Sequence, residues 1–452
     1  MPWPARERPN LMLISIDTLR ADYLGCYGFG EDTSPTLDAL AAAGTRFDDA
    51  VAASPWTLPS HATILSGLYP SRHGAIDHEF ELRAPTLGTL LQRAGYHTMA
   101  IVNTKNIGSE AFGLMRGYDQ KHYELEFSTS TQPDGSIKPG KLILNCGKPI
   151  TRRALEWMDA VPEENPFFFF LHFYDVHTDF TPDRRWREAF VGEYSGSFNG
   201  TTLPLVKVRN GKMAIDETDA TWLKQMYMAE IRTLDEVLAG FFGTMEERGL
   251  MENTVIAITS DHGEEFLEHG SVLHGRTYYE EQTRIPLILH GPGIPKGLVP
   301  DQMVHHIDLA PTLLSLAGVE APPMDGLDLT RAWHAGGLGS DDRHLVSEAD
   351  HNNIVDGRDQ SNIRRMLRSG SHKLIYDTVE ESSKLFDLEA DPLERDDLSK
   401  RDPQRTEELF VHLEAFMQGA VSGHSIGALS EEDQAHMSAL GYGESNEDDE
   451  DE

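Results

Sequence analysis

Five short runs of nearly continuous apolar residues limit the fold of this chain more than any other feature. Each run has the length of a strand, and the near absence of polar residues at alternate positions is typical of strands buried on both faces. The runs occupy residues 11–16, 97–102, 167–173, 255–259 and 285–289. Helical patterns separate them, at residues 34–44, 86–94, 150–160 and 221–247. The alternation predicts an α/β fold in which helices sandwich a large, mostly parallel sheet.

The pattern changes after about residue 335. Short alternating stretches and one helical segment, residues 404–417, replace the apolar runs, which indicates a small α+β subdomain. The chain ends in six consecutive acidic residues, which are too strongly charged to join a packed core. We therefore predict three parts: an α/β domain over residues 1–335, a C-terminal α+β subdomain over 336–443, and an acidic disordered tail over 444–452.

The charge balance excludes several classes of partner. The chain has 74 Asp and Glu against 39 Lys and Arg. Its net charge of −35 repels nucleic acid and anionic lipid and disfavours substrates with several anionic groups.

No apolar run reaches the ~18 residues needed to span a bilayer, and no signal-peptide core opens the sequence. Cys26 and Cys146 cannot form a disulfide framework. We expect a cytoplasmic protein that neither binds nucleic acid nor inserts into a membrane.

Acidic residues and histidines follow three of the apolar runs, where each strand would end. Asp17 follows the first run, Asp175 and His177 the third, and Asp261 and His262 the fourth. Since ligands bind beyond the carboxyl ends of parallel strands, these side chains should lie at one edge of the sheet. A single such Asp is usually a cap or turn residue, but five groups at one edge would repel one another without a cation. We predict a divalent ion, Ca²⁺, Mg²⁺, Mn²⁺ or Zn²⁺, among these groups at the edge of the sheet.

Thr57 precedes Leu58 and Pro59, and a proline is common where a helix begins. Just ahead of a helix N-terminus, unpaired N–H groups and the macrodipole favour an anion. A hydroxyl in that place can bind the same cation and attack phosphorus or sulfur. We therefore predict that Thr57 is both a metal ligand and the nucleophile. The alternative is that Thr57 is only an N-cap.

Two further groups could act on the same substrate. His274 comes twelve residues after His262 and could return to the site to protonate a leaving group. Arg72 could clamp the oxygens of the reacting anion through its guanidinium. A second metal site formed by Asp175, His177 and His274 is the alternative for these residues.

Several longer segments are more specific than these short patterns. They are Ile16-Asp17-Thr18-Leu19-Arg20-Ala21-Asp22-Tyr23-Leu24-Gly25-Cys26-Tyr27-Gly28, Leu58-Pro59-Ser60-His61, Ser66-Gly67-Leu68-Tyr69-Pro70-Ser71-Arg72-His73-Gly74, Ser260-Asp261-His262-Gly263-Glu264 and Leu385-Phe386-Asp387-Leu388. Together they resemble the sulfatase family of the alkaline phosphatase superfamily, over nearly the whole chain. The resemblance implies a catalytic sulfatase-like domain at 1–335, with Asp17, Asp261 and His262 as metal ligands, Thr57 as the nucleophile and His177 in the site.

The chain departs from the family at the nucleophile. Formylglycine-dependent sulfatases have Cys or Ser where this chain has Thr57, and threonine cannot be converted to formylglycine in the usual way. Thr18 stands in place of the second Asp of the family's pair, and His274 in place of its usual Lys. Thr nucleophiles occur in related phosphotransferases of the superfamily. The departures therefore favour phosphate or phosphonate esters, while the family resemblance retains sulfate esters.

The sequence as a whole predicts a metal-dependent, sulfatase-like hydrolase of an anionic ester. Its substrate would be a small-molecule or glycan ester, and its cofactor one divalent ion, or two. A phosphotransferase or mutase of the same superfamily is the first alternative, and a catalytically silent, anion-binding relative is the second. The sequence carries no signal for the oligomeric state.

Overall fold

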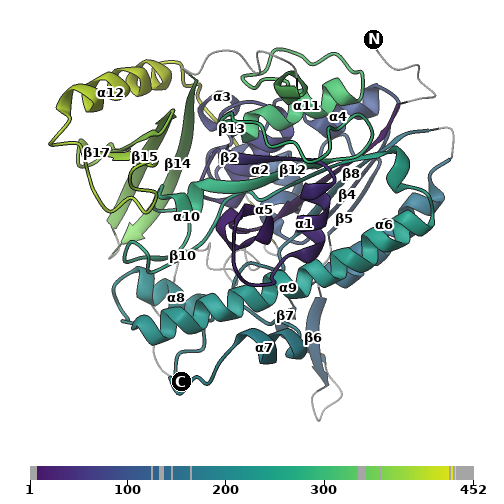
Figure 1. Cartoon of the computed structure of the whole chain (residues 1–452), viewed down its shortest axis with the longest axis horizontal. Coiled ribbons are helices and arrows are strands. Elements are labelled where there is room, and N and C mark those ends of the chain that lie inside the picture. The colour runs from purple at the N-terminus through teal and green to yellow at the C-terminus, as the bar shows by residue number, and fades with distance from the viewer. Residues whose placement is uncertain are drawn as a thin grey trace.

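The computed structural model describes residues 8–123, 126–131, 137–143, 146–162, 165–333, 343–355, 358–426, 429–430 and 433 (Figure 1). Its main body is a large sheet covered by helices, and a small antiparallel sheet stands at one end. The predicted acidic tail, residues 444–452, and the predicted boundary near residue 335 lie outside the described residues.

The central sheet has eight strands in the order β13-β2-β12-β9-β1-β8-β4-β5. β1 pairs in parallel with β8 and β9, whereas β12 runs antiparallel to β2 and β9, so the sheet is mixed but mostly parallel, as predicted. All five apolar runs form strands: β1 (Asn10–Ile16), β4 (His97–Val102), β8 (Phe167–Phe173), β9 (Thr254–Thr259) and β12 (Arg284–His290). The other strands are β2 (Thr45–Val51), β5 (Gln120–Tyr123) and β13 (Val304–His305).

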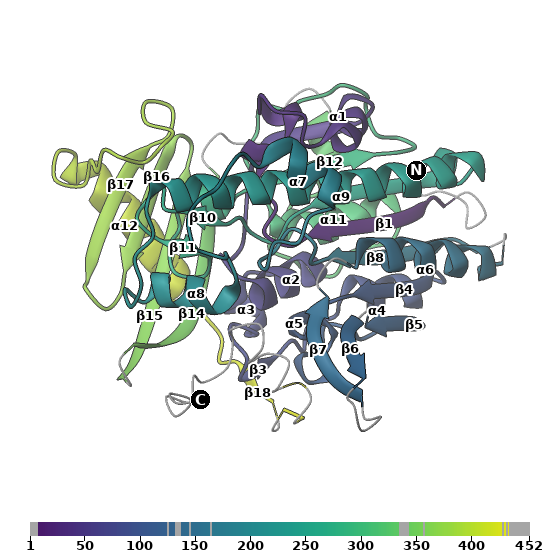
Figure 2. The ribbon, with the colours of Figure 1, turned by 90° about the horizontal axis from the view of Figure 1, so that it is seen from below.

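Helices pack on both faces of this sheet, and Figure 2 shows the longest of them, α9, along the length of the domain. One layer contains α2 (Thr57–Ser66), α4 (Leu87–Arg93) and α11 (Leu309–Leu316). The other contains α1 (Pro35–Ala42), α6 (Gly147–Ala160) and α9 (Glu217–Glu247). Of the helices that the structure describes, none combines the length and apolar character needed to cross a membrane.

Side chains of β1 alternate between two apolar cores, one on each face of the sheet. Leu11 and Leu13 belong to the core that includes α2, α4 and α11. Met12 and Ile14 belong to the core that includes α1, α6 and α9. A strand buried on both faces has no side for polar residues, which explains why its sequence is an apolar run instead of an alternation.

Shorter elements fill the connections between the strands and helices of the main body. They are α3 (Pro70–His73), α5 (Lys105–Gly108), α7 (Arg184–Phe190), α8 (Thr202–Arg209), α10 (Glu280–Thr283), β3 (Phe80–Glu81), β6 (Glu126–Thr131), β7 (Ile137–Ile143), β10 (Glu265–Phe266), β11 (Val272–Leu273) and β18 (His424–Ser425). Several of them follow strands of the sheet and carry residues of the site described below.

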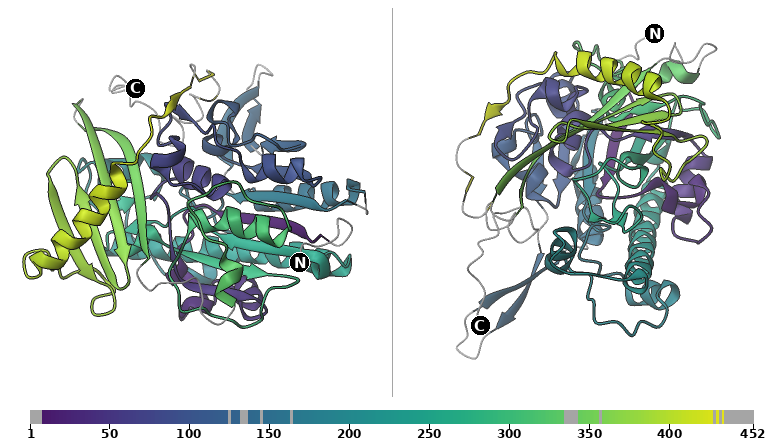
Figure 3. Two further views of the ribbon diagram at one scale, coloured as in Figure 1. Left: turned by 90° about the horizontal axis from the view of Figure 1, so that it is seen from above. Right: turned by 90° about the vertical axis from the view of Figure 1, so that its left-hand side faces the viewer.

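The C-terminal part forms a separate antiparallel sheet, as the change in sequence pattern predicts (Figure 3). Its strands, in order, are β14 (His344–Val355), β15 (Arg358–Ser369), β16 (His372–Asp377) and β17 (Ser382–Asp387). One helix, α12 (Pro403–Met417), packs Leu409 and Leu413 against Leu374 and Leu385 of this sheet. These contacts give the subdomain an apolar core of its own.

Lys373 joins this subdomain to the main body through a buried ionic cluster. Its Nζ lies 3.0 Å from Glu280 Oε1, 2.9 Å from Glu394 Oε1 and 3.1 Å from Thr283 Oγ1. Lys373 lies on β16, whereas Glu280 and Thr283 lie on α10 of the main body. Burial opposes the charge of Glu280, but Lys373 and Arg368 outweigh it and lower the pKa of Glu280 to about 2. The cluster therefore fixes how the subdomain docks.

Replacing Lys373 by Met should destabilise the protein by about 3 kcal/mol or more, because it leaves buried carboxylates without their counter-charge. The matched control is Lys384→Met, since Lys384 is exposed and bonds only a phenol oxygen, that of Tyr279, among its described contacts. That change should cost less than about 0.5 kcal/mol. Urea unfolding measures both. Equal stability of the two variants would show that the buried cluster does not hold the subdomain in place.

His73, at the end of α3, is held neutral by its two hydrogen bonds. The Ala75 N–H donates to Nδ1 at 3.1 Å, so Nδ1 carries no proton, and Nε2 lies 3.1 Å from Thr63 Oγ1 of α2. Burial lowers the pKa of His73 to about 3, against about 6.5 in an unfolded chain. Because the folded pKa is the lower one, the unfolded chain takes up a proton first as the pH falls. The free energy of unfolding is therefore undiminished above about pH 6.5 and decreases as the pH falls towards 3.

The variant His73→Gln should therefore change the acid dependence of stability. Wild-type protein should lose about 2 kcal/mol at this position between about pH 7.5 and pH 5, and the variant should lose nothing there. The gap between their free energies of unfolding should narrow by that amount on acidification. His424→Gln, in the exposed β18, should leave the pH dependence unchanged. A gap of constant size for His73→Gln would contradict the assignment.

Candidate metal centre

Asp17 follows β1 directly and is held at the carboxyl end of the sheet by a tight turn. Its N–H donates to Phe173 O of β8 at 2.9 Å. Thr18, the next residue, has a left-handed backbone with φ of +56°. Tyr227 of α9 holds this turn from both sides, since its hydroxyl donates to Thr18 O at 2.7 Å and accepts from Arg20 N at 2.8 Å. The turn thereby fixes where the Asp17 carboxylate lies.

Asp261 and His262 follow β9, the neighbour of β1. Asp261 Oδ1 accepts from His262 N at 2.9 Å and from Thr18 N at 3.2 Å, which ties the ends of the two strands together. His262 Nδ1 lies 2.9 Å from Gly263 O, and because a carbonyl only accepts, Nδ1 must carry the proton. The lone pair of Nε2 is then available as a metal ligand. Only glycine fits at position 263, where a Cβ would lie 1.9 Å from Glu281 O.

Thr57 is the first residue of α2, so the helix begins two residues earlier than the position of Pro59 predicts. The N-cap residue is Trp56, and no side chain caps the helix. Thr57 Oγ1 is buried and bonds no other atom of the described chain. The alternative that Thr57 serves only as an N-cap is therefore wrong. The hydroxyl lies close enough to Asp17 to lower the pKa of that carboxyl, without the geometry of a hydrogen bond.

Asp17, Asp261 and His262 converge on one point. Each offers a ligand atom, these atoms lie within 4.8 Å of one another, and all three residues are buried. Within the described part of the chain, no hydrogen bond satisfies either oxygen of Asp17, Asp261 Oδ2 or His262 Nε2. Buried carboxylates without a counter-charge are costly, and burial raises the pKa of Asp17 despite the opposing influence of His177, His262 and Thr57. The donor set of hard oxygens and one imidazole fits a divalent cation.

His177 and His274 flank this cluster. The ring centroid of His274 lies 4.3 Å from that of His262 and 5.0 Å from that of His177. His177 Nδ1 lies 2.7 Å from Thr178 O and must carry a proton, so Nε2 accepts from the hydroxyl of Tyr174 at 3.0 Å. Asp17 acts electrostatically on His177, which places both residues in one site.

Two predicted site residues do not join the cluster. Arg72 points towards α12, where its Nη2 donates to Phe416 O at 3.3 Å and its guanidinium lies over the Phe416 ring. Asp175 Oδ1 instead accepts from Gly147 N, at the first turn of α6, at 2.8 Å. The prediction of Arg72 as an oxyanion clamp is therefore wrong. The described residues also contain no second group of ligand atoms at metal spacing, so Asp175, His177 and His274 do not form the predicted second site.

The structure adds residues that the sequence analysis missed. His172 Nε2 lies 3.3 Å from Asp17 Oδ2, and its Nδ1 bonds Asn103 Oδ1 at 3.1 Å. His61 Nε2 bonds Ser15 Oγ at 2.8 Å, and its Nδ1 lies 3.6 Å from Asp261 Oδ2. The signal was present in the sequence, because Ser15 and His172 are polar residues that interrupt otherwise apolar runs near their ends.

These two histidines form a neutral layer beneath the metal cluster. Burial lowers the pKa of His61 to about 3 and that of His172 to about 4, in spite of the nearby Asp261. Neither ring therefore supplies positive charge to the two carboxylates at neutral pH.

Glu264 is a further acidic residue beside the cluster. Its carboxyl is buried and lies 3.2 Å from His274 Nδ1. Burial, followed by the charges of Asp17 and Glu265, raises the pKa of Glu264 well above its usual value. A carboxyl in this position can exchange a proton with His274.

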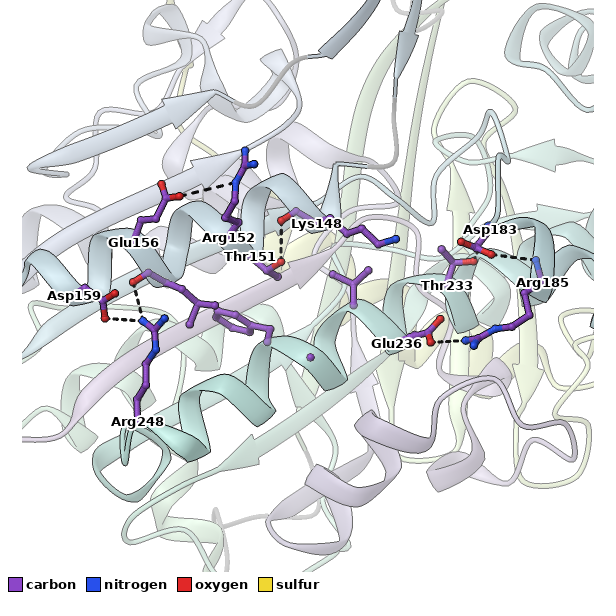
Figure 4. Close-up of a pocket in the computed structure, with 14 residues that line it drawn as sticks. Lys148, Thr151, Arg152, Glu156, Asp159, Asp183, Arg185, Thr233, Glu236 and Arg248 are labelled. Atoms are coloured by element: carbon purple, nitrogen blue, oxygen red, sulfur yellow. Dashed lines mark hydrogen bonds and ion pairs between the residues drawn. The ribbon is translucent and has the colours of Figure 1, made fainter.

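A surface groove of about 710 Å³ lies elsewhere, between α6 and α9 (Figure 4). Its charged side chains pair with one another: Arg248 lies 2.6 Å from Asp159, and Arg185 pairs with Glu236. None of the predicted metal ligands or catalytic residues lines this groove. The arrangement offers no chemistry comparable to that of the metal cluster.

Comparison with known proteins shows that this chain is similar to sulfatases over most of its length. Residues 9–319 match the family described as Sulfatase, and residues 268–420 match the family described as N-sulphoglucosamine sulphohydrolase, C-terminal. The Delta 4,5-hexuronate-2-O-sulfatase of Bacteroides thetaiotaomicron is 25% identical over 452 aligned positions, which cover 90% of this chain and 88% of the relative.

Solved structures show the same fold. A protein in complex with its substrate D-glucosamine-2-N,6-O-disulfate superposes with a TM-score of 0.71 at 21% identity, covering 91% of this chain and 98% of the other. The phosphonate monoester hydrolase of Agrobacterium radiobacter superposes with a TM-score of 0.73 at 19% identity, covering 91% and 96%.

Removing divalent ions with a chelator should lower the melting temperature, because Asp17 and Asp261 are then left together without a counter-charge. Adding the preferred ion at about 100 times its Kd should stabilise the fold by about 2.7 kcal/mol. Asp261→Asn should lose this response. The control Asp235→Asn, at a buried carboxylate that bonds the first turn of α1, should keep it. An equal thermal shift in Asp261→Asn and wild type would place the ion elsewhere.

Proposed function

The chain belongs to the sulfatase family, and from that premise we propose that it is a metal-dependent hydrolase of anionic esters in which Thr57 Oγ1 is the nucleophile. One observation carries the proposal: the Thr57 hydroxyl is buried beside Asp17 and bonds nothing else that the structure describes. Burying a hydroxyl without a hydrogen bond costs free energy, so the residue is hard to explain as a structural one.

Asp17, Asp261 and His262 would hold the divalent ion, which supplies positive charge beside the reacting anion. The N-terminus of α2 adds the positive end of a helix macrodipole at Thr57. Because the surrounding residues are buried, both effects act in a medium of low dielectric constant and are stronger than in water.

The reaction would proceed in two steps. Thr57 Oγ1 transfers its proton to Asp17 and attacks the phosphorus or sulfur atom, while the bond from that atom to the leaving oxygen breaks. His274 gives its proton to the leaving oxygen and recovers one from the Glu264 carboxyl. Water then attacks the phosphorus or sulfur of the Thr57 ester and gives one proton through His274 to the Glu264 carboxylate. The bond to Thr57 Oγ1 breaks, and Thr57 takes back the proton held by Asp17.

Phosphate and phosphonate esters suit this chemistry best, and sulfate esters remain within the proposed class. The family's formylglycine route releases sulfate by elimination, and a threonine ester lacks that exit. The phosphonate monoester hydrolase shares the fold, whereas the Delta 4,5-hexuronate-2-O-sulfatase supports a sulfate ester. Small-molecule or glycan esters are the proposed substrates, in line with the sulfated glucosamine held by one structural neighbour.

Thr57→Ala should reduce turnover by about 10³-fold or more, because alanine cannot form the covalent ester. Thr57→Ser should retain part of the activity. Assays with aryl phosphate, phosphonate and sulfate esters, each with Mg²⁺, Mn²⁺, Ca²⁺ and Zn²⁺, would measure this effect and identify the reaction class.

The control is Ser66→Ala on the same buried helix, whose hydroxyl bonds Ala62 O. It should lose stability but keep its turnover. Full activity of Thr57→Ala with any ester would refute the assigned nucleophile.

A further inference from the structure

Three arginines from separate segments form a chain of hydrogen bonds that ends at His274. Arg364 Nη1 donates to Arg276 O at 2.6 Å, and Arg276 Nη1 donates to Arg209 O at 3.4 Å. Arg209 Nη1 in turn donates to His274 O at 3.2 Å. Arg209 ends α8, Arg276 follows β11 and Arg364 lies on β15, so both subdomains contribute; Figure 2 shows these elements gathered at one end of the molecule.

Arg276 is under the electrostatic influence of the other two arginines. Burial and the charges of Arg209 and Arg364 lower the pKa of Arg276 to about 10. Arg364 is also paired with Asp377, at 2.8 Å, and this pair does not reverse the effect on Arg276. Like charges held together in a partly buried place repel one another, and this gathering runs against the balance of a chain with nearly two acidic residues for each basic one. All three residues are partly exposed, so an anion can reach them.

This arginine group lies next to the metal cluster. Arg209 bonds the backbone of His274, whose ring stands 4.3 Å from that of His262. Through this bond Arg209 joins the arginine group to a residue that flanks the metal cluster.

We propose that Arg209, Arg276 and Arg364 form a subsite for a second anionic group of the substrate, a carboxylate, sulfate or phosphate that is not itself cleaved. Guanidinium groups bind such oxygens in bidentate fashion, which suits a planar or tetrahedral anion. The inference rests on the proposed function and narrows its substrate class to esters with two anionic groups.

The net negative charge of the chain predicts that substrates with several anionic groups are disfavoured, whereas the arginine subsite favours them. The distance over which each of these two electrostatic effects acts decides between them. The charge of the whole surface acts at a distance and is screened within about 8–10 Å at physiological salt. The arginine group acts at contact, in a partly buried place where screening is weak. Net charge would therefore slow the approach of a doubly anionic ester, while the subsite would tighten its binding.

The test compares two esters with leaving groups of similar acidity, phenyl phosphate and 4-(carboxymethyl)phenyl phosphate, together with the matching pair of sulfates. Wild type should have a lower KM for the carboxylate ester. Arg276→Gln should raise that KM by about 10-fold, a loss of about 1.4 kcal/mol, and leave phenyl phosphate unchanged. Arg209→Gln provides a second variant should Arg276→Gln fail to fold. Arg248→Gln, in the groove between α6 and α9, is the control and should alter neither ester.

The outcomes separate the subsite from the proposed function. If wild type hydrolyses none of the four esters, nor an aryl phosphonate ester, under any metal, the proposed function fails and the subsite fails with it. If wild type hydrolyses them without preferring the carboxylate partner, or if the arginine variants weaken both esters equally, the proposed function stands and the subsite is refuted. A selective loss for the carboxylate ester that shrinks with added salt supports the subsite.

Discussion

Two buried carboxylates that face each other at the carboxyl edge of the sheet are the constraint on which this structure depends. Asp17 and Asp261 follow adjacent parallel strands, so the pairing of β1 with β9 brings them together whatever the rest of the chain does. His61 and His172, in the layer below, are neutral and give them no counter-charge. A divalent ion is the simplest group that satisfies both acids and the lone pair of His262.

Much of the surrounding architecture holds these donors in place. Tyr227 reaches from α9 to fix the backbone of the turn that follows Asp17, at Thr18 and Arg20. Gly263 lets the strand end approach Glu281 closely enough for His262 to face the acids. α2 presents Thr57 to the same point with its helix N-terminus. The large apolar cores on the two faces of the sheet thus serve a small polar site, and that site pays for its unsatisfied atoms in stability.

The sequence predicted the parts that depend on local pattern and on strand topology. Apolar runs revealed the strands, and the rule that ligands gather at the carboxyl edge brought Asp17 and Asp261 together. Arg72 could not be placed, because its contact with Phe416 depends on how the C-terminal subdomain docks. Asp175 could not be placed either, because its bond to the first turn of α6, 28 residues earlier, depends on how that helix packs beside the end of β8. His172 escaped notice because a polar residue inside a strand shows its purpose only when the neighbouring strands are known.

The most direct test of this account is a crystal structure of the protein soaked with Mn²⁺, with anomalous diffraction to locate the ion. The account predicts one peak within coordination distance of Asp17, Asp261 and His262, with Thr57 Oγ1 also in contact. An ion bound elsewhere, or a threonine hydroxyl turned away from it, would contradict the assignment of this site and of its nucleophile.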